Sequence, residues 1–126
     1  MATATLNSDR VKVLVVDDSE DLRGLLRAHF EHAGCDVTVV ESAEAAIEAY
    51  TADDHDLAVI DLLLPGMDGW ALTERIGVDR PDCPVAITSV LDADDYPPSK
   101  GVLPKPVNRA SVRDVLLKCV PRWVAP

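Results

Sequence analysis

The sequence predicts an α/β domain built around a doubly wound parallel sheet, with helices on both faces of the sheet. Two observations support this prediction. Nearly continuous apolar runs, typical of strands buried on both faces, are separated by segments whose apolar residues recur every three or four positions. These strand-like and helix-like segments alternate along the chain, and such alternation is typical of parallel strands joined by crossover helices.

Five segments are the expected strands. Four of them are aliphatic runs (VKVLVV, DVTVV, LAVIDLLL and PVAITS), and the fifth, GVLPK, contains a proline that suits the edge of a sheet. In chain order, these strands are expected at residues 11–16, 36–40, 57–64, 84–89 and 101–105.

Four helices are expected, after the first, second, third and fifth strands. Each follows a residue whose side chain can accept a hydrogen bond from the first helical turn: Ser19, Ser42, Asp68 and Asn108. Gly34 supplies the stop of the first helix, whose apolar face comprises Leu22, Leu25, Leu26, His29 and Phe30. The last helix repeats this spacing with Val112, Val115, Leu116, Cys119 and Val120.

The connection between the fourth and fifth strands lacks the features of a helix. Pro97 and Pro98 disfavour helical backbone in the residues before them, and the preceding LDADD has no apolar stripe. We therefore expect the fourth helix to be shortened or replaced by a loop. Either this loop folds back over the neighbouring strands, or it leaves an apolar patch that would suit a partner protein or a homodimer contact.

Composition limits the functions that the chain can have. Its 126 residues, 48% of them hydrophobic, suffice for one domain with its own core, and the net charge of −10 argues against nucleic-acid binding. No apolar run approaches the ~20 residues of a membrane span, so we expect a soluble, cytoplasmic protein with no membrane partner. The three cysteines lack a paired spacing and are expected to be buried thiols. His55 is expected to face solvent, and Trp123 to be partly exposed.

Polar side chains interrupt the apolar runs at the same edge of the expected sheet. Asp17 and Asp18 follow the first strand, Asp61 ends the core of the third, Ser89 ends the fourth and Lys105 ends the fifth. Three carboxylates brought together need a cation, and a hard divalent ion such as Mg²⁺ prefers oxygen ligands. The arrangement favours phosphoryl transfer onto Asp61, with Lys105 and Ser89 holding phosphoryl oxygens. The alternative is that each acid only caps a helix or solvates a turn.

Four motifs, in this order, resemble the receiver domain of two-component response regulators. They are VLVVDDS (residues 13–19), DLLLPGMDG (61–69), PVAITS (84–89) and LPKP (103–106). The resemblance is to stand-alone, chemotaxis-regulator-like members, and it implies a flavodoxin-like five-stranded sheet with strand order 2-1-3-4-5. We accordingly expect a disordered lead-in over residues 1–9, a receiver domain over 10–121, and a C-terminal tail over 122–126 with no output domain.

The resemblance also implies roles for particular residues. They are the phosphoacceptor Asp61, the metal ligands Asp18 and Asp61 with the backbone carbonyl of Leu63, the acidic partner Asp17 (directly or through a water), and the phosphate-binding Ser89 and Lys105. The implied cofactor is Mg²⁺ or Mn²⁺. The implied phosphoryl donor is a histidine kinase or a histidine phosphotransfer protein, and the downstream protein target is unknown. Such a domain catalyses only its own phosphorylation and dephosphorylation, so we do not expect an enzyme.

The sequence departs from the family pattern near the expected site. Leu63 and Leu91 lie two residues beyond Asp61 and Ser89, where apolar side chains cannot orient an attacking water by hydrogen bonding. We therefore expect slow loss of the phosphoryl group, although both could simply be hydrophobic residues at the core edge. Val102 stands where receivers usually carry an aromatic residue three before the lysine, so the usual aromatic switch is expected to be absent.

Two other functions are compatible with parts of the pattern. A degenerate receiver could act as a phosphorylation-independent adaptor, which the missing helix and Val102 favour and the intact set of site residues disfavours. A small aspartyl-phosphate phosphatase is the enzyme alternative. Such phosphatases place two acids one residue apart after the first strand, whereas Asp17 and Asp18 are adjacent here.

Overall fold

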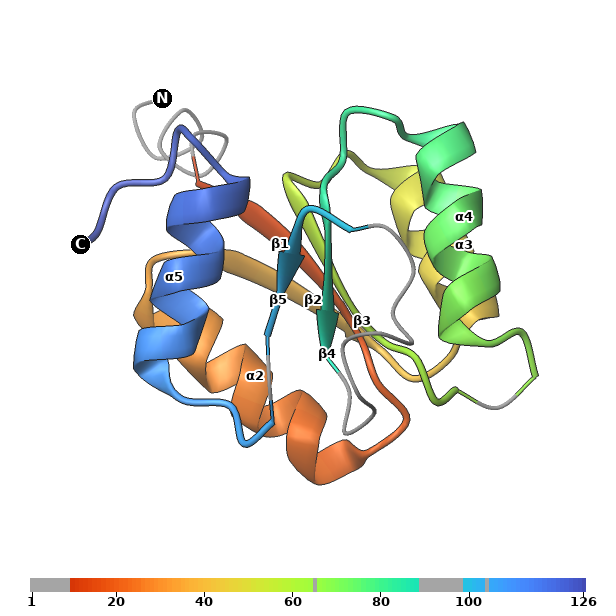
Figure 1. Cartoon of the computed structure of the whole chain (residues 1–126), viewed down its shortest axis with the longest axis horizontal. Coiled ribbons are helices and arrows are strands. Elements are labelled where there is room, and N and C mark those ends of the chain that lie inside the picture. Colours follow the sequence, from red (N-terminus) through yellow and green to blue (C-terminus); the bar gives the residue numbers. More distant parts are fainter. Residues whose placement is uncertain (1–9, 65, 89–98, 104) are drawn as a thin grey trace.

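The computed structural model of the chain describes residues 10–64, 66–88, 99–103 and 105–126 (Figure 1). Its five strands are β1 (Lys12–Val16), β2 (Asp36–Val40), β3 (Leu57–Asp61), β4 (Val85–Thr88) and β5 (Gly101–Val102). All neighbouring strands pair in parallel, in the order β2-β1-β3-β4-β5. The predicted doubly wound, flavodoxin-like sheet with order 2-1-3-4-5 is therefore confirmed.

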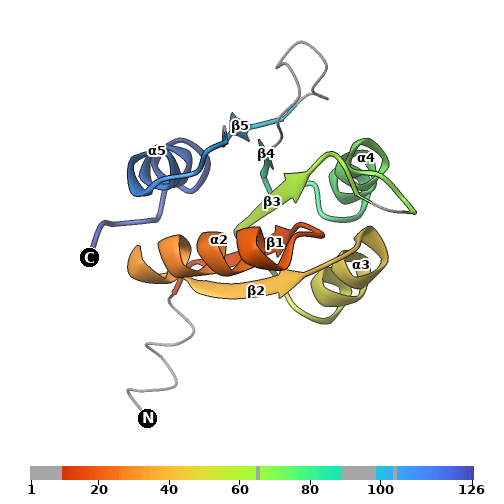
Figure 2. The ribbon, with the colours of Figure 1, turned by 90° about the horizontal axis from the view of Figure 1, so that it is seen from below.

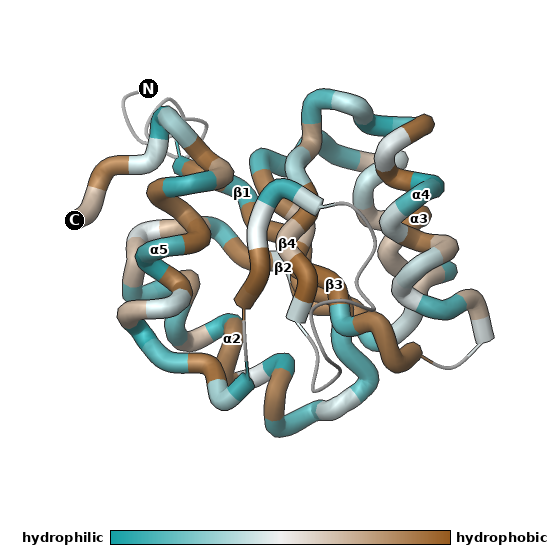
Figure 3. The backbone as a smooth tube through the Cα atoms, in the orientation of Figure 1, coloured by the Kyte–Doolittle hydropathy of each residue, from teal (hydrophilic) through white to brown (hydrophobic). Residues whose placement is uncertain are grey.

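Helices cover both faces of the sheet, as Figure 2 shows from below. They are α2 (Glu20–His32), α3 (Ala43–Ala52), α4 (Gly69–Asp79) and α5 (Arg109–Cys119). The apolar side chains of α2 and α5 pack on one face, and those of α3 and α4 pack on the other. In Figure 3, hydrophobic colour is concentrated along the central strands, and teal segments occur along the helices.

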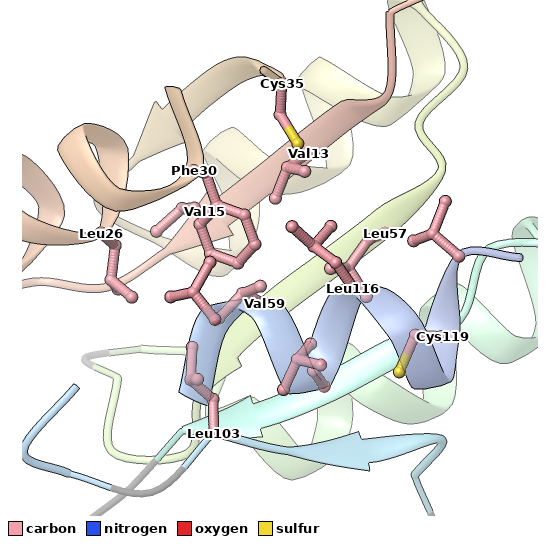
Figure 4. Close-up of a cluster of buried hydrophobic side chains, with 14 of the residues drawn as sticks. Val13, Val15, Leu26, Phe30, Cys35, Leu57, Val59, Leu103, Leu116 and Cys119 are labelled. Carbon is pink, nitrogen blue, oxygen red and sulfur yellow. The ribbon is translucent and has the colours of Figure 1, made fainter. Parts of the chain in front are cut away.

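The core on the α2 and α5 face is largely aliphatic and contains two aromatic residues, Phe30 and Trp123. Phe30 and Leu26 of α2 and Leu116 of α5 are completely buried, and they meet the valines of β1 and β3 (Figure 4). Burial of each such side chain stabilises the fold by roughly 1.5–3 kcal/mol. This core fixes α2 and α5 against the strands whose carboxyl ends carry the acidic residues.

Each described helix begins directly after the residue predicted to cap it. The side chains of Ser19, Ser42, Asp68 and Asn108 accept hydrogen bonds from the backbone N–H groups of Leu22, Ala45, Ala71 and Ser111. The Asn108 cap is reciprocal, because the Ser111 hydroxyl also accepts a hydrogen bond from the N–H of Asn108. After α2 the chain turns at Gly34, whose positive φ of 87° suits glycine.

Several details of the sequence prediction differ from the structure. The third strand ends at Asp61 rather than at residue 64, and β5 has two residues rather than five. Leu25 lies on α2 but is 42% exposed, because the helix buries mainly the stripe containing Leu26 and Phe30. Trp123 is 7% exposed and donates a hydrogen bond from its indole N–H to the carbonyl of Ala33, so this residue of the tail packs against the domain.

The predicted loss of the fourth helix concerns residues that lie largely outside the described part of the chain. Residues 89–98 are not described, and this range includes Leu91 and both adjacent prolines. The described residues form four helices, which fits a shortened fourth helix. The predicted lead-in over residues 1–9 also lies outside the described ranges. None of the helices among the described residues is long and apolar enough to cross a membrane.

Candidate functional site

Three carboxylates converge at the carboxyl edge of the sheet, which is the lower edge in Figure 1. Asp17 and Asp18 directly follow β1, and Asp61 is the last residue of β3. The strands β1 and β3 are hydrogen-bonded neighbours in register, with Val16 beside Ile60, so the residues that follow them lie side by side. Each of the three residues offers a carboxylate oxygen within 4.8 Å of the others. The predicted acidic cluster is therefore present.

The members of this cluster differ in burial. Asp17 is 1% exposed and Asp61 is 5% exposed, whereas Asp18 lies on the surface. Asp17 Oδ1 accepts a hydrogen bond from the N–H of Ser19 at 2.9 Å. Asp17 Oδ2 is buried and accepts no hydrogen bond within the described part of the chain. A buried carboxylate oxygen without a donor is costly unless a cation lies close to it.

Burial also shifts the acid–base behaviour of Asp17. Loss of solvent is the main reason that the pKa of Asp17 is raised above its ordinary value. The N–H of Ser19 opposes this shift, and the nearby charge of Asp61 reinforces it. A divalent cation at the cluster would favour the ionised form of Asp17 and reverse the direction of this effect.

Lys105 supplies the positive charge of the site. Its Nζ lies 3.5 Å from Asp61 Oδ2 and 3.8 Å from Asp17 Oδ2, and its side chain is mostly buried. The lysine follows β5 at the far edge of the sheet, and its long side chain extends back toward the acids. One ammonium group among three carboxylates leaves the cluster with excess negative charge. This charge would attract an additional cation.

Hydrogen bonds and close packing fix the position of Asp61 and the residues next to it. Asp61 Oδ1 accepts a hydrogen bond from the N–H of Leu63 at 3.1 Å, which fixes the carboxylate orientation. The N–H of Gly69 donates to the carbonyl of Leu62 at 3.0 Å, so the start of α4 packs directly on the end of β3. A Cβ at Gly69 would lie 2.4 Å from both the carbonyl oxygen of Asp61 and the Cα of Leu62. Only glycine fits there without a shift of backbone.

Two residues that support the site were not recognised from the sequence. Gly69 belongs to the motif DLLLPGMDG, but nothing in the pattern indicated how near it lies to Asp61. Arg23 donates a hydrogen bond from its guanidinium to the backbone carbonyl of Asp17 at 2.8 Å and so anchors the acidic turn. The only sequence signal for this role of Arg23 is a basic residue about one turn into the helix that follows the two acids.

The hydroxyl predicted at this edge belongs to Ser89, which lies outside the described residues together with Val90 and Leu91. The preceding residue, Thr88, pairs with Asp61 in the sheet register and is completely buried. Leu63 is 49% exposed beside Asp61, so its side chain contributes apolar surface at the rim of the site. Val102 is exposed at the edge strand.

The residues present fit a hard divalent cation. Three carboxylates provide oxygen ligands at one point, and one of their buried oxygens lacks a donor in the described residues. Asp18 and Asp61, the expected direct ligands, and Asp17 all belong to this cluster.

The family model for the response regulator receiver domain matches residues 13–117, which is most of the chain. The chain belongs to the response regulator receiver family. This receiver is 35% identical over 124 residues to the transcriptional activator protein PfeR of Pseudomonas aeruginosa, covering 86% of this chain and 38% of PfeR. It is 31% identical over 117 residues to the alkaline phosphatase synthesis transcriptional regulatory protein PhoP of Bacillus subtilis, covering 83% of this chain and 48% of PhoP. The receiver thus spans less than half the length of these relatives.

Solved structures show the same fold. A CheY-like receiver domain from Methylobacillus flagellatus superposes with a TM-score of 0.79 at 23% identity, covering 86% of this chain and 97% of that one. The response regulator TrrA from Thermotoga maritima, solved in complex with Mg²⁺-BeF, superposes with a TM-score of 0.81 at 21% identity, covering 87% and 99%. Membership in this family identifies the chain as a phosphorylation-accepting domain of the response regulator type.

Proposed function

We propose that this receiver accepts a phosphoryl group on Asp61 from a phosphohistidine, in a reaction that requires Mg²⁺ or Mn²⁺. The observation that carries the proposal is the meeting of Asp17, Asp18 and Asp61 with Lys105 at one edge of the sheet. Carboxylates that collect at a parallel sheet edge beside a lysine suit binding of a charged phosphoryl group with a divalent cation.

The proposed reaction is a direct displacement at phosphorus. A carboxylate oxygen of Asp61 forms the new P–O bond, and the bond from phosphorus to the histidine nitrogen of the donor breaks, leaving the electron pair on that nitrogen. A cation bound at the acidic cluster would neutralise negative charge on the phosphoryl oxygens. Asp61 is oriented for attack by the N–H of Leu63, and the Lys105 ammonium lies close enough to hold a phosphoryl oxygen once the acyl phosphate forms.

Asp17 and Asp18 have different parts in this proposal. Asp18 is exposed and offers its carboxylate as a direct ligand of the cation. Asp17 is buried and anchored by Ser19 and, through its backbone carbonyl, by Arg23. Its remaining oxygen faces the cluster and can hold the cation directly or through a water. In this account the domain catalyses only its own modification and releases the dephosphorylated donor.

The donor is proposed to be a histidine kinase or a histidine phosphotransfer protein, and the output is proposed to be binding of a partner protein. Support for both comes from family membership. Exposed Val102 in place of an aromatic residue supports an output that does not use an aromatic switch. The described acidic site keeps all three carboxylates and the lysine, which favours phosphorylation over the adaptor function.

Intact mass spectrometry tests this function. The protein is incubated with acetyl phosphate or with a phosphohistidine-bearing phosphotransfer protein, in Mg²⁺ or in excess chelator. We expect a gain of one phosphoryl mass with Mg²⁺, no gain with chelator, and no gain for Asp61→Asn. Asp114→Asn, an exposed carboxylate on α5, is the matched control and should be modified normally. Absence of any gain with both donors would contradict the proposal.

A further inference from the structure

A cavity lies at the opposite edge of the sheet from the acidic site. It has a volume of about 600 Å³ and is formed by the loop between α3 and β3, the loop between α4 and β4, and the end of α5. The ends of α4 and α5 that approach it lie at the upper edge of Figure 1, whereas the carboxyl ends of β1 and β3 lie at the lower edge. Nothing in phosphoryl transfer uses this cavity.

The inner wall of the cavity is apolar. Tyr50, Ile76 and Val120, which line it, are almost completely buried, and half-buried Cys83 adds to the same wall. Tyr50 is fixed by a hydrogen bond from its hydroxyl to Asp79 Oδ2 at 2.6 Å. A cavity of this size with a preformed apolar wall suits the body of a small organic molecule.

The rim of the cavity carries carboxylates, most of which are already paired. Arg80 contacts Asp54 at 3.0 Å, and Arg122 contacts Asp56 at 2.8 Å. Asp79 accepts a hydrogen bond from Arg75 as well as from Tyr50. These pairs leave one rim carboxylate, that of Asp82, which makes no ion pair with any other described residue.

Two further features make the rim favourable for a positive charge. The carboxyl ends of α3, α4 and α5 all lie at this edge, because each helix runs opposite to the strands, and helix carboxyl ends carry partial negative charge. His55 lines the cavity, is half-buried rather than solvent-facing, and has a buried Nδ1 that makes no hydrogen bond within the described residues. Burial is the main reason that the pKa of His55 is lowered, and it outweighs the opposing effect of Asp53. The neutral ring is therefore favoured and adds no positive charge that would repel a cation.

A bare metal ion fits the cavity poorly. Among the described residues, the only group of three potential metal ligands within reach of one another is Asp17, Asp18 and Asp61, at the other edge of the sheet. A single unpaired carboxylate and a half-buried imidazole beside an apolar wall suit an ammonium group attached to an apolar body. We propose that this cavity is a binding site for a small organic monocation, with the ammonium near Asp82 and His55 and the apolar body against Tyr50, Ile76 and Cys83.

The proposal is tested by NMR titration with 2-phenylethylamine, in saturating Mg²⁺ so that the acidic site does not attract the amine. The neutral 2-phenylethanol and the anionic 3-phenylpropionate serve as controls of similar size that differ from the amine in charge. For a ligand this small we expect saturable binding with a Kd on the order of 1 mM. Amide shifts should be confined to residues 50–58 and 76–84 and the end of α5. The alcohol should bind more weakly than the amine, and the carboxylate should not bind.

A variant at the unpaired carboxylate tests the charge directly. Asp82 is exposed, so Asp82→Asn should fold normally and weaken amine binding about three- to fivefold, as for loss of one partly solvated charge pair. Asp82→Lys should abolish amine binding, and Asp114→Asn should leave it unchanged. Equal affinity for the amine and the alcohol, shifts confined to the region of Asp61, or no saturable binding of the amine would each overturn the proposal.

Discussion

The packing of Gly69 against the end of β3 leads to a specific prediction about stability and phosphorylation. In Gly69→Ala the new Cβ would lie 2.4 Å from the Asp61 carbonyl oxygen and 2.4 Å from the Leu62 Cα. Both are backbone atoms of the sheet, so they cannot rotate away as a side chain could. The start of α4 must instead move, which stretches the hydrogen bond from Gly69 N–H to the Leu62 carbonyl. We expect a loss of about 1–3 kcal/mol in the free energy of unfolding.

Gly77 in the same helix provides a matched control. A Cβ at Gly77 would meet no atom within 4 Å, and Gly77→Ala replaces a flexible residue inside α4. This variant should therefore be more stable than the wild type by roughly 0.5–1 kcal/mol. The same chemical change is thus expected to have opposite signs at two positions of one helix.

Urea unfolding followed by circular dichroism measures both effects. The midpoint should fall for Gly69→Ala and rise for Gly77→Ala, with little change in the slope of either transition. Because Gly69 contacts the backbone of Asp61, Gly69→Ala should also slow phosphorylation under conditions in which it remains folded. Equal stability of Gly69→Ala and Gly77→Ala would contradict the close packing of α4 on β3. It would also contradict the inference that this packing positions Asp61.

Three further predictions concern other parts of the molecule. Leu63→Asn places an amide beside Asp61 in place of an exposed apolar side chain, and it should accelerate loss of the phosphoryl group severalfold. The decay of phosphoprotein after removal of the donor measures this rate. An unchanged rate would contradict the expected role of Leu63. Burial raises the pKa of Cys83 to about 11, so at about pH 8 this thiol should react with a disulfide reagent roughly 100-fold more slowly than an ordinary thiol, and urea should restore a normal rate. Burial acts to raise the pKa of Asp56, but hydrogen bonds from Arg122 and from the N–H of Lys12 outweigh it and lower the pKa. Asp56 therefore stabilises the fold above its unfolded pKa, and the stability difference between wild type and Asp56→Asn, about 1 kcal/mol at neutral pH, should shrink as pH falls from about 5 to about 2.

The convergence of the acidic residues could be predicted because it depends on topology alone. Residues at the carboxyl ends of adjacent parallel strands lie side by side, so the sequence alone predicts that Asp17, Asp18 and Asp61 lie together. Prediction of Lys105 at the site needs more information, because its position depends on the order of the strands and on the length of its side chain. The helix starts were predictable because a single capping side chain determines each one.

Other features depend on packing between segments that are distant in sequence. The spacing of Leu25 fits the apolar stripe of α2, but the width of the buried stripe is set by β1, β2 and α5, and Leu25 falls outside it. Trp123 is buried because the chain after α5 returns to the end of α2. The role of Gly69 follows from how closely α4 approaches β3, which no local pattern encodes.

The central claim is that Asp61 carries the phosphoryl group, and chemical mapping of the modified residue tests it most directly. After phosphorylation in Mg²⁺, treatment with borohydride reduces an acyl phosphate to an alcohol, and peptide mass spectrometry locates the reduced side chain. The account predicts reduction at position 61 alone, with no reduced peptide from protein incubated in chelator. Reduction at position 17 or 18 in place of 61, or a phosphoryl group on a serine, threonine or histidine, would contradict it.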